Sequence, residues 1–423
     1  MLRSKFFSIK SLVNQTPPIY WILFYLIFHF YLVFSYTKQT NYNFNLLIHI
    51  NQKYIELNPE TKFSSLVVLE QEGYDGQFFY FLSRYIYDKN IKTVTLDSST
   101  FRMLRIGVSV LYGFLPYYLG WSNYAILGIL LNILIFIVSF IMLYKLLDQD
   151  SKYVSFFYLF NPFSFVSNML LIGDNFFISF FVIFAYFFSK SLGRENHKKK
   201  QMLYYFGSLF FSIFLVFLKE TALFYFLPLF FYFFIKKDMK NTLLFSIPIW
   251  FFFIWFFMIK SYIKVEEISS LSHLERIRVP FKDLVFFYFS LIENFITNRN
   301  FSKTFPYILL LFILISLGFQ LINFLRIYNN FKELITLKFF ELFFYAPIAL
   351  VILSVVIVDY EYWLAFDNIF RIFAFAFLWI IFLIVLRKLE DYNDYGFFFL
   401  LTITTVLLGI RYYYKKIGDF TIL

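Results

Sequence analysis

Cysteine is absent from the 423-residue sequence, and this absence excludes disulfide bonds, thiolate metal sites and cysteine nucleophiles. Charged residues are scarce as well, at 15%, whereas a soluble domain has about 25%. The phosphate-binding strings GxxxxGK and GxGxxG do not occur, and neither does the nucleophile motif GxSxG. The four histidines are scattered without metal-ligand spacing. The sequence therefore lacks the common nucleotide-binding, hydrolase and metal-site signatures.

Apolar residues are abundant instead. The chain is 60% hydrophobic and 26% aromatic, with 69 phenylalanines, and its mean hydropathy is +0.68. This composition excludes a disordered protein, a coiled coil and almost any soluble enzyme. A membrane-spanning helix needs about 20 mostly apolar residues, so the length allows about ten or eleven spans with their loops. We predict an all-α, polytopic membrane protein in contact with the lipid bilayer.

The net charge of +11 comes from basic residues that cluster in short loops, which indicates membrane topology rather than nucleic-acid binding. Residues 190–200, residues 236–240 and the Arg387-Lys388 pair are predicted to face the cytoplasm. The first apolar stretch, residues 19–36, follows a basic N-terminal segment without a small-residue cleavage site. We interpret it as a signal anchor, and no nucleic-acid partner is expected.

These anchors predict one transmembrane domain over residues 1–423 with two large extracytoplasmic loops, residues 37–122 and 260–304. The first loop is expected to carry interfacial helices. One of its segments, residues 106–119, is short and contains two glycines and a proline, which favours an interfacial or re-entrant position. Residues 279–295 in the second loop are aromatic and amphipathic, a pattern typical of a helix on the membrane surface.

Two further apolar regions decide how many spans there are. Residues 202–235 would form a helix of about 51 Å, too long for a core of about 30 Å, so we expect two spans that turn at Lys219-Glu220. Residues 153–171 are expected to form a single span that ends before Gly173-Asp174. Whether residues 397–410 span the membrane is left open, because the basic tail would then face outward, against the usual rule.

This topology places many charged residues at the same, outer membrane face. They are Asp75, Arg102, Arg105, Asp174, Lys219, Glu220, Asp359, Glu361, Asp367 and Arg371. Charges at the bilayer edge still carry a desolvation penalty. For any single residue an ordinary charged loop is the simpler interpretation, but the whole set favours a polar cavity that opens outward and toward lipid.

Asp75 lies in the most distinctive local string, residues 73–80, where two glycines flank it and aromatic residues follow. The glycines would let the backbone approach a ligand closely, and an isolated acid suits a general base. The alternative is a Gly-Asp-Gly turn before an amphipathic helix, which the string alone favours. Arg102 and Arg105 lie three residues apart, so a helix would present both to phosphate oxygens, or both would snorkel to lipid headgroups.

Three other positions have two interpretations each. Lys219-Glu220 suits either a phosphate contact with its orienting partner or a structural turn. Asp174 follows a glycine and suits either a ligand contact or a plain turn. Arg371 lies about one turn inside its predicted span, where a cation usually has a partner, and this favours a functional role.

The string at residues 73–80 resembles bacterial members of the GT-C glycosyltransferases, and most of all integral-membrane mannosyltransferase-like proteins related to GPI mannosyltransferase II. The likeness continues, in order, through residues 101–105, residues 160–162 with Gly173-Asp174, residues 218–221 and residues 367–371. Two positions depart from the pattern. The expected proline is displaced to Pro116, and Asp174 stands where relatives often have glutamate.

The resemblance implies an inverting transferase that moves a sugar from a polyprenyl-phosphate-linked donor to an acceptor hydroxyl on the extracytoplasmic side. Asp75 would be the catalytic base. The residues implied to hold the donor phosphate are Arg102, Arg105, Lys219 and Arg371, and those implied to bind substrate are Tyr74, Gln77, Asp174 and Glu220.

No metal and no cofactor are expected beyond the lipid-linked donor. The many Phe, Lys, Asn and Ile residues suggest a prokaryotic source, so we expect a multi-pass protein of the cell inner (cytoplasmic) membrane. Whether the acceptor is a glycan, a lipid or a protein is left open. Mannose is one candidate for the sugar. A flippase or transporter for lipid-linked glycans and an O-antigen polymerase or ligase are the alternatives. A transporter predicts internal pseudo-symmetry, which the sequence does not show. A ligase predicts its large outer loop late in the chain, whereas here the largest outer loop directly follows the first apolar stretch.

Overall fold

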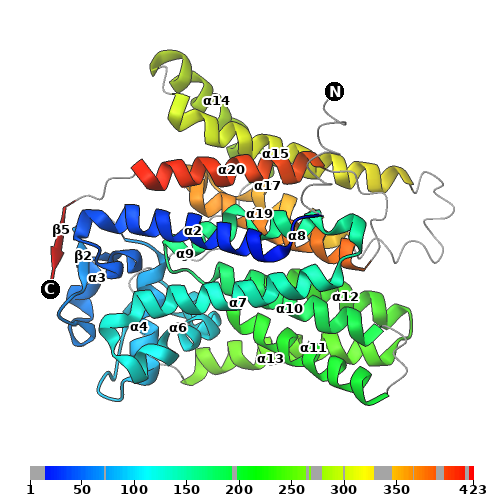
Figure 1. Ribbon diagram of the computed structural model, residues 1–423, viewed down its shortest axis with the longest axis horizontal. Helices are drawn as coiled ribbons and strands as arrows, with labels where there is room; N and C mark the ends of the chain where they lie inside the picture. Colours follow the sequence, from blue (N-terminus) through cyan, green and yellow to red (C-terminus); the bar gives the residue numbers. More distant parts are fainter. Residues whose placement is uncertain are drawn as a thin grey trace. The chain divides into compact units, whose positions relative to one another are not determined.

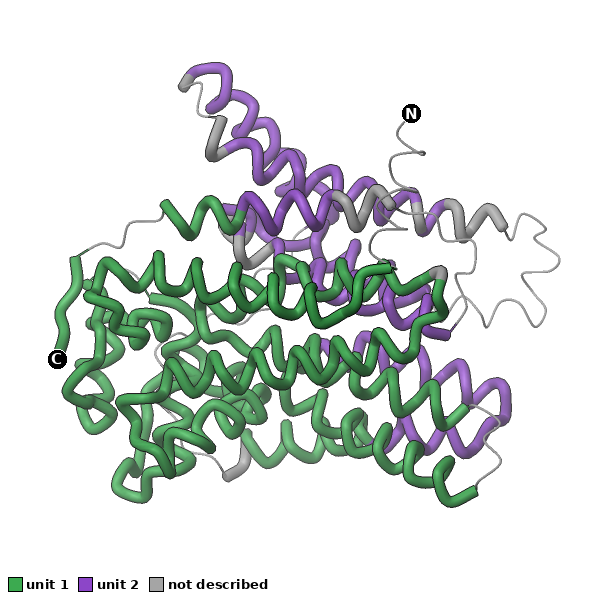
Figure 2. The backbone as a smooth tube through the Cα atoms, in the orientation of Figure 1, with its two compact units in different colours: residues 1–220, 248–270, 408–423 green, residues 221–247, 271–407 purple. Residues whose placement is uncertain are grey.

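The computed structural model describes residues 15–70, 73–192, 198–262, 266–267, 279–298, 301–327, 345–364, 366–386, 395–414 and 419–423. Helices dominate this part of the chain, and two small sheets accompany them (Figure 1). The chain divides into two compact units (Figure 2). The first comprises residues 1–220, 248–270 and 408–423, and the second comprises residues 221–247 and 271–407. The single domain expected over residues 1–423 stays a prediction.

The first unit holds most of the helices. They are α2 (Pro18–Thr37), α3 (Gln52–Leu57), α4 (Asp75–Tyr87), α5 (Ser99–Leu104), α6 (Ile106–Leu119), α7 (Tyr124–Leu146), α8 (Tyr153–Leu159), α9 (Pro162–Met169), α10 (Asp174–Leu192) and α11 (Lys198–Leu218). Short 3₁₀ turns link them: η1 (Lys38–Thr40), η2 (Phe44–Ile48), η3 (Pro59–Thr61), η4 (Trp121–Asn123) and η5 (Gln149–Ser151). A further 3₁₀ turn, η6 (Glu220–Ala222), begins at Glu220 in this unit and continues into the second. Within this unit α10 packs against α7 and α11, and α4 packs against α6.

The second unit is helical as well. Its helices are α12 (Leu223–Ile235), α14 (Lys282–Asn298), α15 (Phe301–Ile327), α17 (Ala346–Ile357), α18 (Tyr360–Leu364) and α19 (Phe366–Val385). Two helices cross the unit boundaries, α13 (Met239–Tyr262) and α20 (Tyr395–Tyr414). The amphipathic stretch predicted over residues 279–295 forms α14, whereas residues 263–265 and 268–278 of the second loop lie outside the described part.

Five helices in the described part are long and apolar enough to cross a membrane, by length and composition. They cover Pro18–Thr40, Trp121–Leu146, Asp174–Leu192, Lys198–Leu218 and Met239–Ile259. Shorter apolar helices follow at Ile106–Leu119, Glu220–Ile235, Thr304–Phe319, Ala346–Ile357 and Phe370–Val385. The predicted all-α membrane protein is therefore confirmed, while the number of about ten or eleven crossings stays a prediction.

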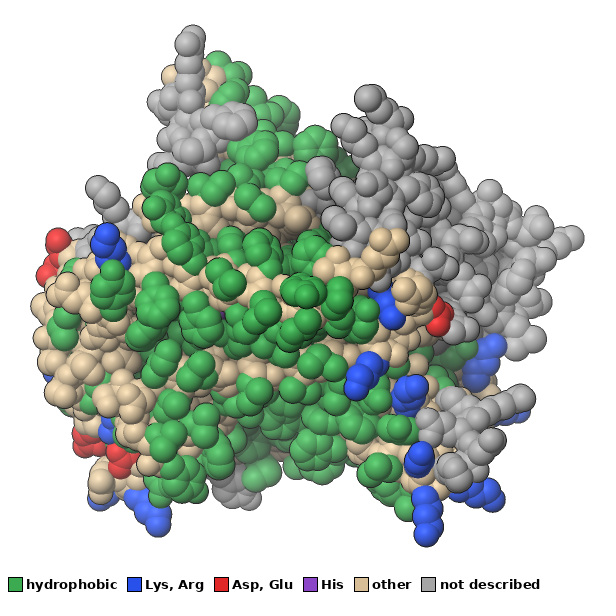
Figure 3. Space-filling view, in the orientation of Figure 1, with side chains coloured by type: hydrophobic (Ala, Val, Ile, Leu, Met, Phe, Trp, Pro, Cys, Tyr) green, Lys and Arg blue, Asp and Glu red, His purple; other side chains and the backbone are tan. Residues whose placement is uncertain are grey.

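The long helices expose apolar side chains where a soluble protein would have polar ones. On α2 the exposed residues include Ile19, Leu23 and Ile27, and on α7 they include Leu130 and Leu134. Figure 3 shows hydrophobic side chains covering the middle of the visible face, whereas lysine, arginine and acidic side chains gather toward its ends. This distribution suits helices that face lipid and end at water.

One expected span is not a single continuous helix. Residues 153–171 form two short helices, α8 and α9, rather than a single one. The break falls at Asn161-Pro162, because proline lacks a backbone N–H and disfavours the helical conformation of the residue before it. Asn161 instead caps α9, its side-chain oxygen accepting the N–H of Ser164 at 2.8 Å. The predicted break at Lys219 is confirmed, since α11 ends at Leu218.

The first loop contains strands that the sequence analysis did not predict. β1 (Ile50–Asn51) pairs in parallel with β2 (Val67–Leu69), which pairs antiparallel with the C-terminal strand β5 (Phe420–Ile422). β3 (Thr95–Leu96) pairs in parallel with β4 (Glu266–Glu267). Runs of two or three residues are too short to show an alternating pattern, which explains why they were missed.

Candidate functional site

Asp75 is the first residue of α4, where a negative charge interacts favourably with the helix dipole. The residue before it, Tyr74, is tied down because its N–H donates to the carbonyl of His49 at 3.1 Å. The side chain of Asp75 is 24% exposed, and its Oδ1 accepts a hydrogen bond of 2.9 Å from Nη2 of Arg102. The predicted base is thus a partly exposed carboxylate on a fixed backbone.

The two glycines beside Asp75 have a packing role. A Cβ at Gly76 would lie 2.4 Å from the carbonyl oxygen of Leu170, and one at Gly73 would lie 2.8 Å from Cβ of Asn51. Both distances are too short for a real Cβ atom. These two glycines therefore let other parts of the same chain pack closely against the backbone. The sequence analysis interprets them instead as positions where a ligand approaches the backbone.

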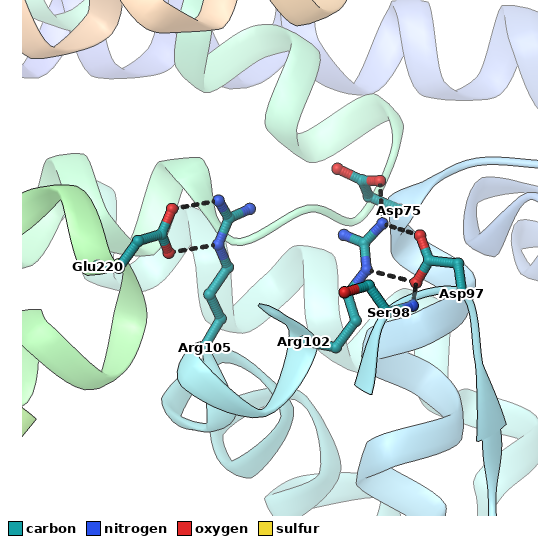
Figure 4. Close-up of polar contacts among 6 residues, drawn as sticks. All are labelled: Asp75, Asp97, Ser98, Arg102, Arg105 and Glu220. Atoms are coloured by element: carbon teal, nitrogen blue, oxygen red, sulfur yellow. Dashed lines mark hydrogen bonds and ion pairs between the residues drawn. The ribbon is translucent and has the colours of Figure 1, made fainter. Parts of the chain in front are cut away.

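Arg102, on α5, is held by two carboxylates (Figure 4). Its Nε and Nη2 donate to the two oxygens of Asp97, at 2.9 and 2.7 Å, and Nη2 also donates to Asp75. Burial alone would lower the pKa of Arg102, but the negative charges of Asp75 and Asp97 outweigh it and raise the pKa above its usual value. The guanidinium group therefore stays charged although it is buried.

Aromatic rings complete the surroundings of Arg102. Its Cζ lies 4.5 Å from the ring centroid of Phe78 and 5.4 Å from that of Phe101. Its third nitrogen, Nη1, is buried and has no hydrogen-bond partner among the described residues. A buried donor without a partner in a native fold calls for an explanation, and a bound anion supplies one.

Arg105 forms a second ion pair beside the first. Its Nε and Nη2 donate to the two carboxylate oxygens of Glu220 at 2.8 and 2.6 Å, the forked geometry that suits a guanidinium (Figure 4). Its Cζ also lies 3.9 Å from the ring centroid of Phe101. Burial alone would raise the pKa of Glu220, but Arg105 and Lys219 lower it below its usual value. Glu220 is therefore ionised near neutral pH.

Lys219 and Asp174 form the third pair. Nζ of Lys219 donates to Oδ1 of Asp174 at 2.5 Å, and both side chains are less than 10% exposed. Asp174 is the first residue of α10, which follows Gly173. A Cβ at Gly173 would lie 2.3 Å from Val108 on α6, so this turn also needs a glycine. Because Lys219 and Glu220 are consecutive, the same turn of the chain contributes one residue to each of two ion pairs.

The structure thus joins six of the predicted site residues into three ion pairs of the first unit. Tyr74 is half-buried beside Asp75. Gln77 is buried, and its side-chain oxygen accepts the N–H of Asn51 at 3.0 Å, so it holds β1 in place. Asp97 was missed as a site residue, and its only signal in the sequence is an acid five residues before Arg102.

The remaining predicted residues belong to the second unit. Arg371 and Asp359 are buried there. The side chains of Glu361 and Asp367 and the Arg387-Lys388 pair lie outside the described part. No group of three or more acidic or histidine side chains in the described part of the chain suits a metal ion. The expectation that no metal is needed stays a prediction.

No protein-family model, curated protein or solved structure matches this chain.

Proposed function

We propose that this protein is an integral-membrane glycosyltransferase of the GT-C type. It would transfer a sugar from a polyprenyl-phosphate-linked donor to an acceptor hydroxyl at the extracytoplasmic face of a cytoplasmic membrane. The observation that carries the proposal is the partly exposed carboxylate of Asp75, held by the buried Arg102 in a unit of lipid-facing helices. A donor with a lipid tail would enter such a site from the bilayer.

In this proposal Asp75 acts as the general base. It accepts the proton of the acceptor hydroxyl as that oxygen bonds to the anomeric carbon of the sugar. The bond from this carbon to the phosphate oxygen breaks on the opposite side, so the configuration inverts. Arg102 donates a hydrogen bond of 2.9 Å to Oδ1 of Asp75 and so helps to orient the carboxylate for proton transfer.

The leaving phosphate needs positive charge that is already in place. Arg102 is the best-supported phosphate ligand, because its Nη1 is a buried donor without a described partner. Arg105 and Lys219 already pair with Glu220 and Asp174, so either would have to share its charge with an acid. For Arg371, the proposal rests on the sequence resemblance.

The test uses the purified chain in nanodiscs with radiolabelled sugars on polyprenyl phosphate, mannose included. Asp75→Asn keeps the size of the side chain and removes the base, and we expect sugar transfer to fall about 10²–10⁴-fold while donor binding persists. Asp88→Asn is the matched control, because Asp88 at the end of α4 pairs with Arg84 at 2.8 Å, and it should retain transfer.

Three results would contradict the proposal in different ways. If the wild-type protein binds no lipid-linked sugar, the transferase proposal fails as a whole. If Asp75→Asn transfers sugar at the wild-type rate, Asp75 is not the base. If the wild-type protein moves the lipid across a vesicle bilayer without transferring its sugar, the flippase alternative replaces the transferase.

A further inference from the structure

We propose that Asp97 is a positioning residue that limits how strongly Arg102 neutralises Asp75. The inference rests on the proposed role of Asp75 as a base and adds a residue to the same site. Asp97 does not have to touch the substrate for this role, since it acts through the guanidinium group of Arg102.

The geometry of the pair carries the inference. The two carboxylate oxygens of Asp97 accept hydrogen bonds from Nε and Nη2 of Arg102, at 2.9 and 2.7 Å (Figure 4). Asp97 is itself fixed, because its Oδ1 accepts the N–H of Ser98 at 2.7 Å. The N–H of Arg102 donates in turn to the carbonyl of Ser98 at 3.0 Å. The acid and the arginine are therefore locked to the same turn of the chain.

Asp75 and Asp97 share one guanidinium group. Asp97 accepts hydrogen bonds from Nε and Nη2 of Arg102, and Asp75 accepts one from the same Nη2, at 2.9 Å. The positive charge of Arg102 is therefore divided between two carboxylates. The negative charge of Asp97 also opposes that of Asp75. Asp75 therefore accepts a proton more readily than it would beside Arg102 alone.

Other titratable or charged groups of the described residues lie near this pair. Tyr54 on α3 interacts with both Asp97 and Arg102. Arg105 is neutralised by Glu220, and Lys219 by Asp174. Any effect of Asp97 therefore has to be measured against variants that leave these groups unchanged.

The protonation of Asp75 can be followed without turnover. A carbodiimide reacts with protonated carboxyl groups, and mass spectrometry of the labelled full-length protein in nanodiscs gives the extent of labelling at Asp75 against pH. Replacing Asp97 by asparagine removes a negative charge and frees Arg102 for Asp75. Asp97→Asn is therefore expected to move the pH of half-maximal labelling downward by about one unit.

Two variants serve as controls. Asp88→Asn removes a carboxylate of similar exposure from another arginine pair and should leave the labelling pH of Asp75 unchanged. Asp97→Glu retains the charge and should stay within about 0.3 pH units of the wild-type protein. If Asp97→Asn does not fold, Asp97→Ser, which also removes the negative charge beside Arg102, should lower the labelling pH instead.

An unchanged or raised labelling pH in Asp97→Asn would overturn the inference and leave Asp97 as a purely structural residue. The same result would arise whether or not the wild-type protein transfers sugar, because labelling reads protonation alone. A failed transferase assay with the expected labelling shift would instead refute the proposed function and retain the coupling between the two carboxylates.

Discussion

At the scale of single residues, Arg105 and Glu220 lie 115 positions apart in the sequence and form a two-bond fork. The Arg105 side chain is 9% exposed, so little water reaches its charge. Removing one partner of such a pair leaves the other charge without compensation, and this is costlier than removing both.

Glu220→Gln is therefore expected to destabilise the protein by about 2–3 kcal/mol, a value reduced from that of a fully buried pair because Glu220 is 22% exposed. The free energy of unfolding of each variant would be measured by titration with dodecyl sulfate in mixed micelles. Arg105→Gln combined with Glu220→Gln should recover part of this loss. If the double variant is as unstable as the sum of the singles, the two residues are not coupled.

The Arg105–Glu220 pair also makes the free energy of unfolding depend on pH. The pKa of Glu220 lies below its usual 4.5 in the folded protein, so the folded state binds fewer protons than the unfolded state. The stabilisation is complete above pH 4.5 and is lost as the pH falls through the lower folded-state pKa. The stability difference between the wild-type protein and Glu220→Gln should shrink only in that acidic range.

Gly76 offers a second test at this scale. Gly76→Ala would place a methyl group 2.4 Å from the carbonyl oxygen of Leu170, a backbone atom that cannot turn away, and we expect a loss of about 1–3 kcal/mol. Gly318→Ala is the control, because no described atom beyond its own helix turn lies within 4 Å of the position that its methyl group would take; it should be neutral or stabilise by up to about 1 kcal/mol. Equal effects of the two variants in the same unfolding assay would argue against the tight contact at Gly76.

At the scale of elements, the break between α8 and α9 shows how the Asn161-Pro162 pair interrupts an apolar segment. Pro162 starts α9, and Asn161 accepts the N–H of Ser164 at 2.8 Å and donates to the carbonyl of Tyr158 at 2.6 Å. The side chain of Asn161 thus satisfies backbone groups on both helices, which matters more where water is excluded.

Asn161→Ala is expected to lower the unfolding free energy by about 1–2 kcal/mol, because it removes the cap in a buried position. Asn161→Ser should recover much of this loss, since serine also caps helices well. Asn123→Ala, at the exposed start of α7 where no side chain caps the helix, should change stability by less than about 0.5 kcal/mol. A smaller loss in Asn161→Ala than in Asn123→Ala would contradict the capping role.

At the scale of the whole molecule, the small sheet of the first unit constrains the membrane topology. β5 near the C-terminus pairs with β2 in the first loop, with Val67 opposite Ile422. Paired strands lie about 4.8 Å apart, whereas the hydrocarbon core is about 30 Å thick. We therefore expect the C-terminal strand to lie on the same side of the membrane as the first loop. In that topology an even number of crossings separates the two strands.

The absence of cysteine makes this topology directly measurable, because each introduced cysteine is unique. Leu423→Cys and Tyr42→Cys change exposed residues at the C-terminus and in the first loop. An impermeant maleimide should label both from the same side of oriented vesicles and should label Lys199→Cys, in the predicted cytoplasmic loop, from the other side. Labelling of Leu423→Cys together with Lys199→Cys would contradict the topology.

The sequence by itself determined the membrane class, most helix positions and the turn at Lys219. Long apolar runs and clustered charges are local features, and a lipid environment forces such runs to satisfy their backbone groups as helices. It also singled out Asp75, Arg102, Arg105, Asp174, Lys219 and Glu220, because charges at the edge of apolar segments stand out in the linear chain.

Only the tertiary structure decided how these charges pair. Arg105 meets Glu220 across 115 residues, and Arg102 meets Asp75 across 27, distances over which no local pattern carries information. The same holds for β5, whose pairing with β2 depends on the return of the chain to the first loop. Asp97 could not be recognised from the sequence, because its role depends on sharing the guanidinium group of Arg102 with Asp75. Only the fold brings these three side chains together.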